Sequence, residues 1–153
     1  MADSSQKQLG QRRFRRTRSD HASETAEDYV EAIAERIAEA GECRGADLAR
    51  EFGVSHVTVT KTVARLQAEG LVDTAPYGPL SLTRRGQSLA KASRQRHEVV
   101  LAFLLAIGVS PETAEIDAEG IEHHVSQETL DRFRELIADL DQRGERVKDS
   151  ADA

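Results

Sequence analysis

The apolar positions of this chain repeat mainly at three- and four-residue intervals, which is the spacing of amphipathic helices. The first predicted helix covers residues 25–40, where Thr25 followed by Asp28 is typical of a capping pair at a helix start. Its apolar face is formed by Tyr29, Val30, Ile33 and Ile37. Gly41 and Gly45 follow this face and predict the end of the helix.

Residues 46–66 predict two short helices joined by a tight turn. Gly53 permits the turn, and Ser55 can cap the second helix. The expected inward positions are Leu48, Ala49 and Phe52 in the first helix and Val59, Val63 and Leu66 in the second. Two short helices joined by a turn that contains glycine form a helix-turn-helix unit, so this stretch predicts DNA binding.

The outward residues of the second helix are suited to reading DNA. They are Val57, Thr58, Lys61 and Arg65. In a major groove, Thr58 can bond to a base edge or a phosphate, and Val57 can pack on a thymine methyl group. Lys61 can reach a guanine edge or a phosphate. Lys61 and Arg65 could instead only solubilise the helix, but the preceding turn favours contact with DNA.

Residues 71–82 predict a small hairpin, because two short extended runs flank the Pro-Tyr-Gly-Pro sequence at 76–79. A hairpin directly after a recognition helix is typical of the wing in a winged helix. We therefore expect a winged helix-turn-helix DNA-binding domain at residues 25–90.

A long helix is predicted over residues 84–107, and its second half, 99–107, is almost entirely apolar. Such a segment must be buried, and in so short a chain a second subunit is the expected cover. Ser110 and Pro111 predict the start of another helix, and residues 126–146 predict the last one. We therefore expect a mainly α fold, with a helical dimerisation domain at residues 91–147 and a disordered tail at 148–153.

Composition limits the class of fold and the cellular compartment that we expect. Aromatic residues are few, which favours packed helices over sheets. Cys43 is the only cysteine, so an internal disulfide is excluded and a reducing cytosol is indicated. No apolar run reaches the length of a membrane span, and no signal peptide is recognisable. We expect a cytoplasmic protein that does not enter a membrane.

The charge is unevenly distributed. The formal net charge is −6, which argues against a generic nucleic-acid binder, yet residues 7–18 carry six positive charges. We expect residues 1–24 to form a disordered basic arm that can add salt-dependent phosphate contacts beside a DNA-binding module.

Residues 119–124, Glu-Gly-Ile-Glu-His-His, carry the candidate chemistry. On a helix, Glu119, Glu122 and His123 share one face, where two carboxylates and an imidazole suit a first-row divalent metal. A solvated acidic helix with two histidines is an equally good interpretation of this hexapeptide alone. Considered singly, Asp28, Glu31 and His97 also favour structural or solvated roles.

The same residues resemble the manganese transport regulators, a branch of the diphtheria toxin repressor family of metal-dependent transcriptional repressors. The resemblance runs from Glu27 to Leu140. Its best matches are Ala-Glu-Asp-Tyr-Val-Glu at 26–31, Val-Thr-Lys at 59–61, Arg-His-Glu at 96–98, and Asp-Ala-Glu-Gly-Ile-Glu-His-His-Val-Ser at 117–126. The last of these is specific to the manganese branch.

The resemblance implies a homodimer that binds a palindromic operator in double-stranded DNA when a binuclear metal site is filled. The six ligands that it implies are Asp28, Glu31, His97, Glu119, Glu122 and His123. Glu119 and Glu122 are expected to bridge two ions in each subunit. Oxygen-rich ligands suit Mn²⁺, with Fe²⁺ as the alternative ion.

We therefore predict a manganese-responsive repressor of manganese uptake genes that is not an enzyme. Two alternatives are open at this point. A metal-independent winged-helix regulator could respond to an organic ligand through the same fold. A hydrolytic metalloenzyme could use Glu119, Glu122 and His123, although a catalytic site needs an open coordination position and a substrate cleft.

Overall fold

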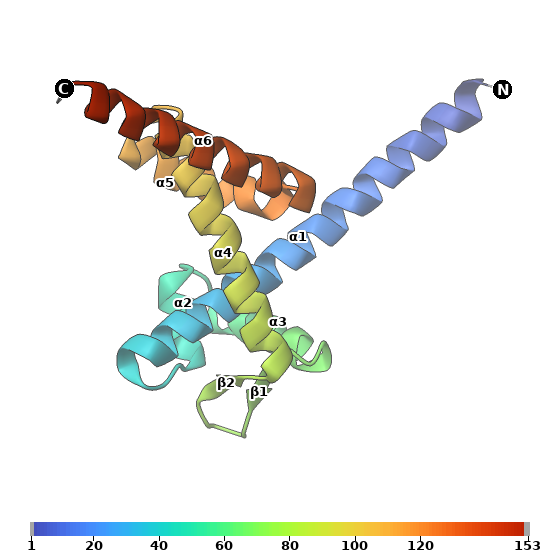
Figure 1. Cartoon of the computed structure of the whole chain (residues 1–153). Helices are drawn as coiled ribbons and strands as arrows, with labels where there is room; N and C mark the ends of the chain where they lie inside the picture. The colour runs from blue at the N-terminus through green and yellow to red at the C-terminus, as the bar shows by residue number, and fades with distance from the viewer. Residues whose placement is uncertain (1, 152–153) are drawn as a thin grey trace. The chain divides into compact units, whose positions relative to one another are not determined.

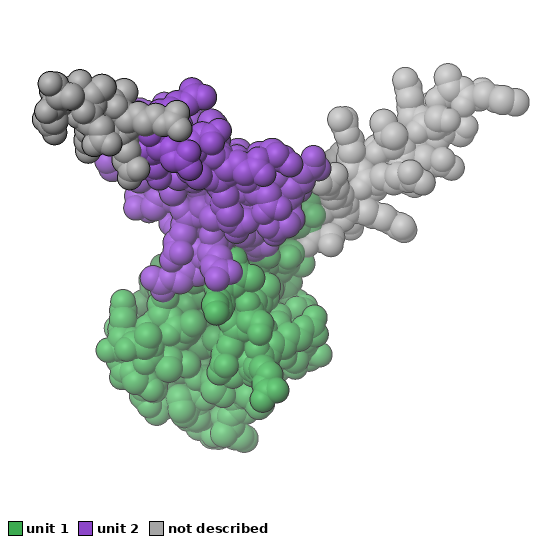
Figure 2. Space-filling model, in the orientation of Figure 1, with its two compact units in different colours: residues 1–92 green, residues 93–153 purple. Residues whose placement is uncertain are grey.

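A computed structural model of the chain describes the backbone of residues 2–151 and the side chains of residues 20–143. The chain forms two compact units, residues 1–92 and 93–153 (Figure 2). In chain order the elements are α1 (Ala2–Ala40), α2 (Gly45–Glu51), α3 (His56–Ala68), β1 (Val72–Thr74), β2 (Leu80–Leu82), α4 (Arg84–Ala106), α5 (Pro111–Ile121), the 3₁₀ helix η1 (Glu122–His124) and α6 (Gln127–Ala151) (Figure 1).

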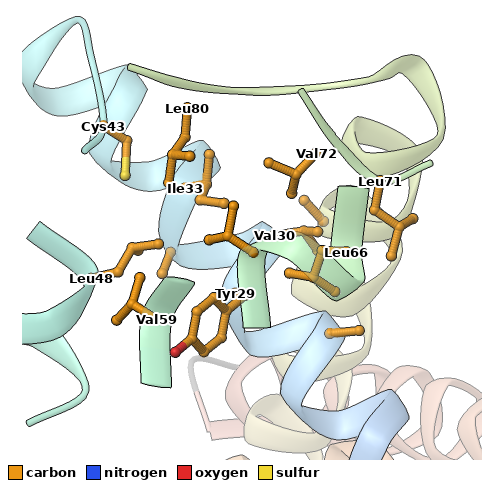
Figure 3. Close-up of a cluster of buried hydrophobic side chains, with 14 of the residues drawn as sticks. Tyr29, Val30, Ile33, Cys43, Leu48, Val59, Leu66, Leu71, Val72 and Leu80 are labelled. Carbon is orange, nitrogen blue, oxygen red and sulfur yellow. The ribbon is translucent and has the colours of Figure 1, made fainter. Parts of the chain in front are cut away.

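The core of the first unit joins α1 to the helix-turn-helix. Figure 3 shows Tyr29, Val30 and Ile33 of α1 packed among apolar side chains of α2, α3 and the hairpin. The predicted inward residues Leu48, Ala49, Val59, Val63 and Leu66 are all buried. Phe52 is half-buried and stacks on Tyr29, with 4.6 Å between ring centroids. The predicted helix-turn-helix is therefore confirmed.

Two local features form the turn between α2 and α3. Gly53 adopts a φ of 63°, a left-handed conformation that favours glycine, and so permits the tight turn. The backbone N–H of Thr58 then donates to Ser55 Oγ at 3.2 Å, which caps α3 as predicted. The predicted wing is also present, because β1 and β2 pair antiparallel with Val72 opposite Leu82.

The wing is held against the start of α4 by a close backbone approach. Thr83 Oγ1 donates to the Gly70 carbonyl at 2.7 Å, and the backbone N–H of Gly86 donates to Thr83 Oγ1 at 3.1 Å. A Cβ atom at Gly86 would lie 2.0 Å from the Leu71 carbonyl oxygen. Only glycine fits at this position without a shift of the backbone.

The second unit packs α4, α5 and α6 around Val100, Leu104, Ala114, Ala118 and Leu130. Phe103 of α4 stacks on Phe133 of α6 with 3.8 Å between ring centroids. The apolar segment 99–107 is not wholly covered within one chain, because Leu105 and Ile107 are 42% and 52% exposed. Among the described residues, no helix has the length and apolar character needed to cross a membrane.

Three predicted helix limits need correction. Thr25 is not a helix start, because α1 runs through it and Thr25 Oγ1 donates to the His21 carbonyl one turn earlier. Helix α5 ends at Ile121, so Glu122 and His123 belong to a 3₁₀ turn rather than to the same α-helix as Glu119. Helix α6 extends to Ala151 rather than ending near residue 146. Where a disordered arm and tail were predicted, the backbone of residues 2–24 and 148–151 is helical, as part of α1 and α6. Residues 1, 152 and 153 lie outside the described residues.

Candidate metal centre

The candidate site of the second unit is assembled from three elements. His97 lies on α4, Glu119 on the last part of α5, and Glu122 and His123 on η1. Glu122 on η1 is turned into the protein interior, while Glu119 on α5 remains at the surface. Glu122 is 3% exposed at its side chain, whereas Glu119 is 68% exposed.

His97 is the centre of this arrangement. Its Nδ1 lies 2.5 Å from Glu122 Oε2 and 3.5 Å from Glu119 Oε1. One ligand atom from each of His97, Glu119 and Glu122 lies within 4.8 Å of the other two. His123 approaches the other oxygen of Glu122, with 3.7 Å between His123 Nε2 and Glu122 Oε1. The four candidate ligands of the second unit therefore converge around one buried carboxylate.

When no cation is bound, the electrostatics of the site favour a proton shared by Glu122 and His97. Burial raises the pKa of Glu122 to about 7, although the hydrogen bond and charge of His97 oppose this. Burial also acts to lower the pKa of His97, but the hydrogen bond to Glu122 and the negative charges of Glu122, Glu119 and Glu115 outweigh it, so that pKa is raised. The pair of His97 and Glu122 therefore holds a proton near neutral pH.

The residues present fit a divalent cation. A buried carboxylate is costly unless a positive charge neutralises it, and Glu122 is buried beside a second carboxylate. Two carboxylates and imidazole nitrogens are hard and borderline donors that suit Mn²⁺, Fe²⁺ or Zn²⁺. The set contains no sulfur ligand, because Cys43 is buried in the core of the first unit.

One residue of this cluster, Glu115, was not predicted from the sequence. Glu115 Oε2 lies 3.6 Å from His97 Nε2, on the opposite side of the ring from Glu122. Its spacing was a usable signal, since Glu115 and Glu119 are four residues apart and share one face of α5.

The remaining predicted ligands and the predicted DNA contacts lie in the first unit. Asp28 and Glu31 are half-buried residues of α1. On α3, Thr58 and Lys61 are exposed and the side chain of Val57 is 63% exposed, as an outward recognition surface requires. Arg65 differs from them, because its guanidinium donates to the Ala22 carbonyl at 3.2 Å and lies 3.6 Å from Glu69. This gives Arg65 a role in holding α3 against α1.

Comparison with known proteins agrees with a DNA-binding domain followed by a metal-binding domain. Residues 21–80 match the family described as iron-dependent repressor, N-terminal DNA-binding domain. Residues 83–146 match the iron-dependent repressor, metal-binding and dimerisation domain. The transcriptional regulator MntR of Escherichia coli O157:H7 is 51% identical over 121 residues, which make up 79% of this chain and 78% of that protein. The chain belongs to the iron-dependent repressor family.

Other members of the family agree with this assignment. The HTH-type transcriptional regulator MntR of Bacillus subtilis is 37% identical over 123 residues, covering 80% of this chain and 87% of that protein. A solved structure of a manganese-dependent transcriptional repressor in complex with manganese is 29% identical, with a TM-score of 0.67 over 74% of this chain. The match covers 52% of that repressor, so this chain spans about half the length of the solved relative.

Family membership confirms the predicted fold, a winged helix-turn-helix followed by a helical metal-binding and dimerisation domain. It also confirms the resemblance drawn from the sequence. The relatives are transcriptional regulators, so the protein is a DNA-binding regulator and not a hydrolytic enzyme. Binding of a divalent metal and formation of a homodimer follow from the second domain.

Proposed function

We propose that this protein is a manganese-responsive transcriptional repressor that acts as a homodimer on a palindromic operator and controls manganese uptake genes. The observation that carries the proposal is the convergence of His97, Glu119 and Glu122 in the domain that follows a winged helix. Its relatives in Escherichia coli and Bacillus subtilis are named as the transcriptional regulator MntR, and a solved relative is described as a manganese-dependent transcriptional repressor. A protein that acts on chromosomal DNA is expected in the cytoplasm.

We propose six ligands for two ions in each subunit. His97, Glu119, Glu122 and His123 come from the second unit, where their side chains already gather. The half-buried carboxylates of Asp28 and Glu31 on α1 complete the set, as the resemblance implies. Mn²⁺ has the lowest intrinsic affinity among the divalent first-row ions, so a site cannot select it by binding strength alone. Selection for Mn²⁺ would depend instead on the number of ligands and on their hard carboxylate oxygens. Fe²⁺ is the competing ion.

The response to metal follows from the charges of this chain. Without a cation, the carboxylates around His97 repel one another, and the proton held by His97 and Glu122 relieves only part of that repulsion. A bound ion supplies the positive charge that lets these carboxylates stay ionised and close together. Ligands on α1 as well as on α4, α5 and η1 would make the position of the DNA-binding domain depend on metal.

The DNA-binding surface consists of Val57, Thr58 and Lys61 on the exposed side of α3. In a dimer, two copies of α3 can enter successive major grooves when they are held about 34 Å apart. A coupling free energy of about 1–3 kcal/mol between metal and operator would change DNA affinity roughly 5- to 150-fold, which is sufficient for a switch.

The proposal is tested by measuring DNA binding as Mn²⁺ is added. The duplex is first selected from a random pool by the wild-type protein in Mn²⁺, and binding is then followed by fluorescence anisotropy. We expect the wild type to bind only with metal and Glu122→Ala to lose this dependence. Glu128→Ala, at an exposed position in the first turn of α6, is the matched control.

The same measurement separates the remaining alternative, a regulator that is independent of metal and responds to an organic ligand. Equal DNA binding by the wild type with Mn²⁺ and with a chelator would support that alternative and reject the proposed function. Metal-dependent binding that survives in Glu122→Ala would instead reject the assigned site.

A further inference from the structure

Both ring nitrogens of His97 face carboxylates. Nδ1 lies 2.5 Å from Glu122 Oε2 and 3.5 Å from Glu119 Oε1, whereas Nε2 lies 3.6 Å from Glu115 Oε2. Glu119 and Glu122 belong to the proposed ligand set, but Glu115 does not. When one ring nitrogen of a histidine binds a metal ion, a carboxylate beside the other nitrogen can accept its N–H.

The role of this carboxylate follows from the position of the proton on the imidazole ring. A neutral ring carries one N–H, and only the other nitrogen has a lone pair for a metal ion. Nδ1 is the ring nitrogen that lies near both ligand carboxylates, so an ion held by Glu119 and Glu122 needs the lone pair of Nδ1. In a neutral ring whose Nδ1 offers its lone pair to the ion, the single N–H is on Nε2. An acceptor is then required at Nε2.

We propose that Glu115 is a positioning residue for metal binding, whose carboxylate accepts the Nε2–H of His97 and holds the ring in the tautomer that leaves Nδ1 available to the ion. This inference rests on the proposed metal-dependent function. Histidines that bind metals usually donate their second N–H to a carboxylate, a carbonyl or water, and loss of such a partner weakens metal binding about 10- to 100-fold.

Glu115 can reach this position with little change. Its side chain is 61% exposed, so it can rotate, and the distance of 3.6 Å to Nε2 must shorten by less than about 1 Å to reach hydrogen-bond length. Glu115 precedes Glu119 by one turn of α5, and both residues contact the ring of His97. Water can replace the exposed carboxylate of Glu115 as the acceptor. We therefore expect removal of this carboxylate to weaken metal binding by about tenfold, the lower end of the 10- to 100-fold range.

The first test measures the affinity of the protein for Mn²⁺, which is titrated alone. Calorimetric titration of the full-length protein compares the wild type with Glu115→Ala, Glu115→Gln and Glu112→Gln. Glutamine keeps an acceptor oxygen but removes the charge, and Glu112 is an exposed acid three residues earlier on α5. We expect Glu115→Ala to bind Mn²⁺ about tenfold more weakly, Glu115→Gln to retain most of the affinity, and Glu112→Gln to match the wild type.

The tautomer of His97 is the second test, and a purely structural role for Glu115 would not affect it. Long-range ¹H–¹⁵N correlation spectra of the protein loaded with diamagnetic Cd²⁺ assign the proton on each ring nitrogen. We expect the proton of His97 on Nε2 and the ion on Nδ1 in the wild type, with Nε2–H exchanging faster with solvent in Glu115→Ala.

The outcomes separate this inference from the proposed function. If the wild type binds no Mn²⁺, the proposed function fails together with the inference. If the wild type binds Mn²⁺ and Glu115→Ala binds it equally well, only the role of Glu115 is rejected. An equal loss in Glu115→Ala and Glu115→Gln that disappears at high salt would mean general charge attraction and would also reject positioning. A Cd²⁺-loaded ring with its proton on Nδ1 would reject it as well.

Discussion

His97 Nδ1 and Glu122 Oε2 lie 2.5 Å apart and join α4 to η1 across the interior of the second unit. The contact places a carboxylate that is 3% exposed against an imidazole that is 19% exposed. Because neither group is well hydrated, each depends on the other, or on a cation, for stabilisation of its charge. In the proposed site, protonation and metal binding are therefore linked at one pair of atoms.

The stability of the metal-free protein should fall as pH rises from about 5 to about 8. The folded-state pKa of Glu122 is raised from 4.5 to about 7, so its contribution is fully present below 4.5 and is lost as pH rises through 7. The raised pKa of His97 acts in the same direction. We expect a loss of about 1–3 kcal/mol in the free energy of unfolding, measured by urea denaturation with a chelator present.

Glu122→Gln is the matched variant for this pH dependence. It keeps the shape of the side chain and an acceptor for His97 but cannot ionise. We expect its free energy of unfolding near pH 8 to exceed that of the metal-free wild type, although it binds no metal. An unchanged pH profile in Glu122→Gln would contradict the assignment of the effect to this residue.

Metal binding should release a proton and weaken in acid. An ion bound by His97 and Glu122 must displace the proton that this pair holds, because a ligand atom cannot carry a proton and a metal together. We expect Mn²⁺ affinity to fall up to about tenfold for each pH unit below about 7. Calorimetry in two buffers of different ionisation enthalpy counts the released protons, and a count of zero near pH 6.5 would contradict this mechanism.

Gly86→Ala should destabilise the first unit by at least about 2 kcal/mol. Its Cβ would lie 2.0 Å from the Leu71 carbonyl oxygen, and a backbone atom cannot move away without disturbing the wing. Gly120→Ala is the control of opposite sign, because its Cβ would meet no atom within 4 Å beyond its chain neighbours and the backbone of its own helix, and alanine favours a helix by up to about 1 kcal/mol. Thermal unfolding of the two variants checks the prediction, and equal effects would reject it.

Lys61→Gln should weaken DNA binding similarly on all sequences. Lys61 is an exposed cation on α3, and loss of one phosphate contact should lower the slope of log affinity against log salt concentration by about 1. Lys91→Gln, an exposed lysine on α4, is the control and should leave the slope unchanged. A change of sequence preference in Lys61→Gln would show that Lys61 reads a base instead.

Much of the first unit could be predicted because local patterns are decisive there. The spacing of Leu48, Val59 and Leu66, the turn at Gly53 and the cap at Ser55 are short-range features, and each was found where predicted. The start of α1 was missed because Thr25 is equally able to cap a helix or to bond one turn back inside it. The close approach of Gly86 to Leu71 joins residues 15 positions apart and has no local pattern.

The sequence by itself determined the fold class, the helix-turn-helix and the wing, because helical periodicity and turn chemistry act over a few neighbouring residues. The six candidate ligands came from the family resemblance and stay a prediction. Only the tertiary structure decided that His97, 25 residues before Glu122, meets it at 2.5 Å, that Glu122 is buried while Glu119 is exposed, and that Glu115 faces the second ring nitrogen. These facts depend on how α4, α5 and η1 pack together, and burial and distance, not residue type, set the charge of the site.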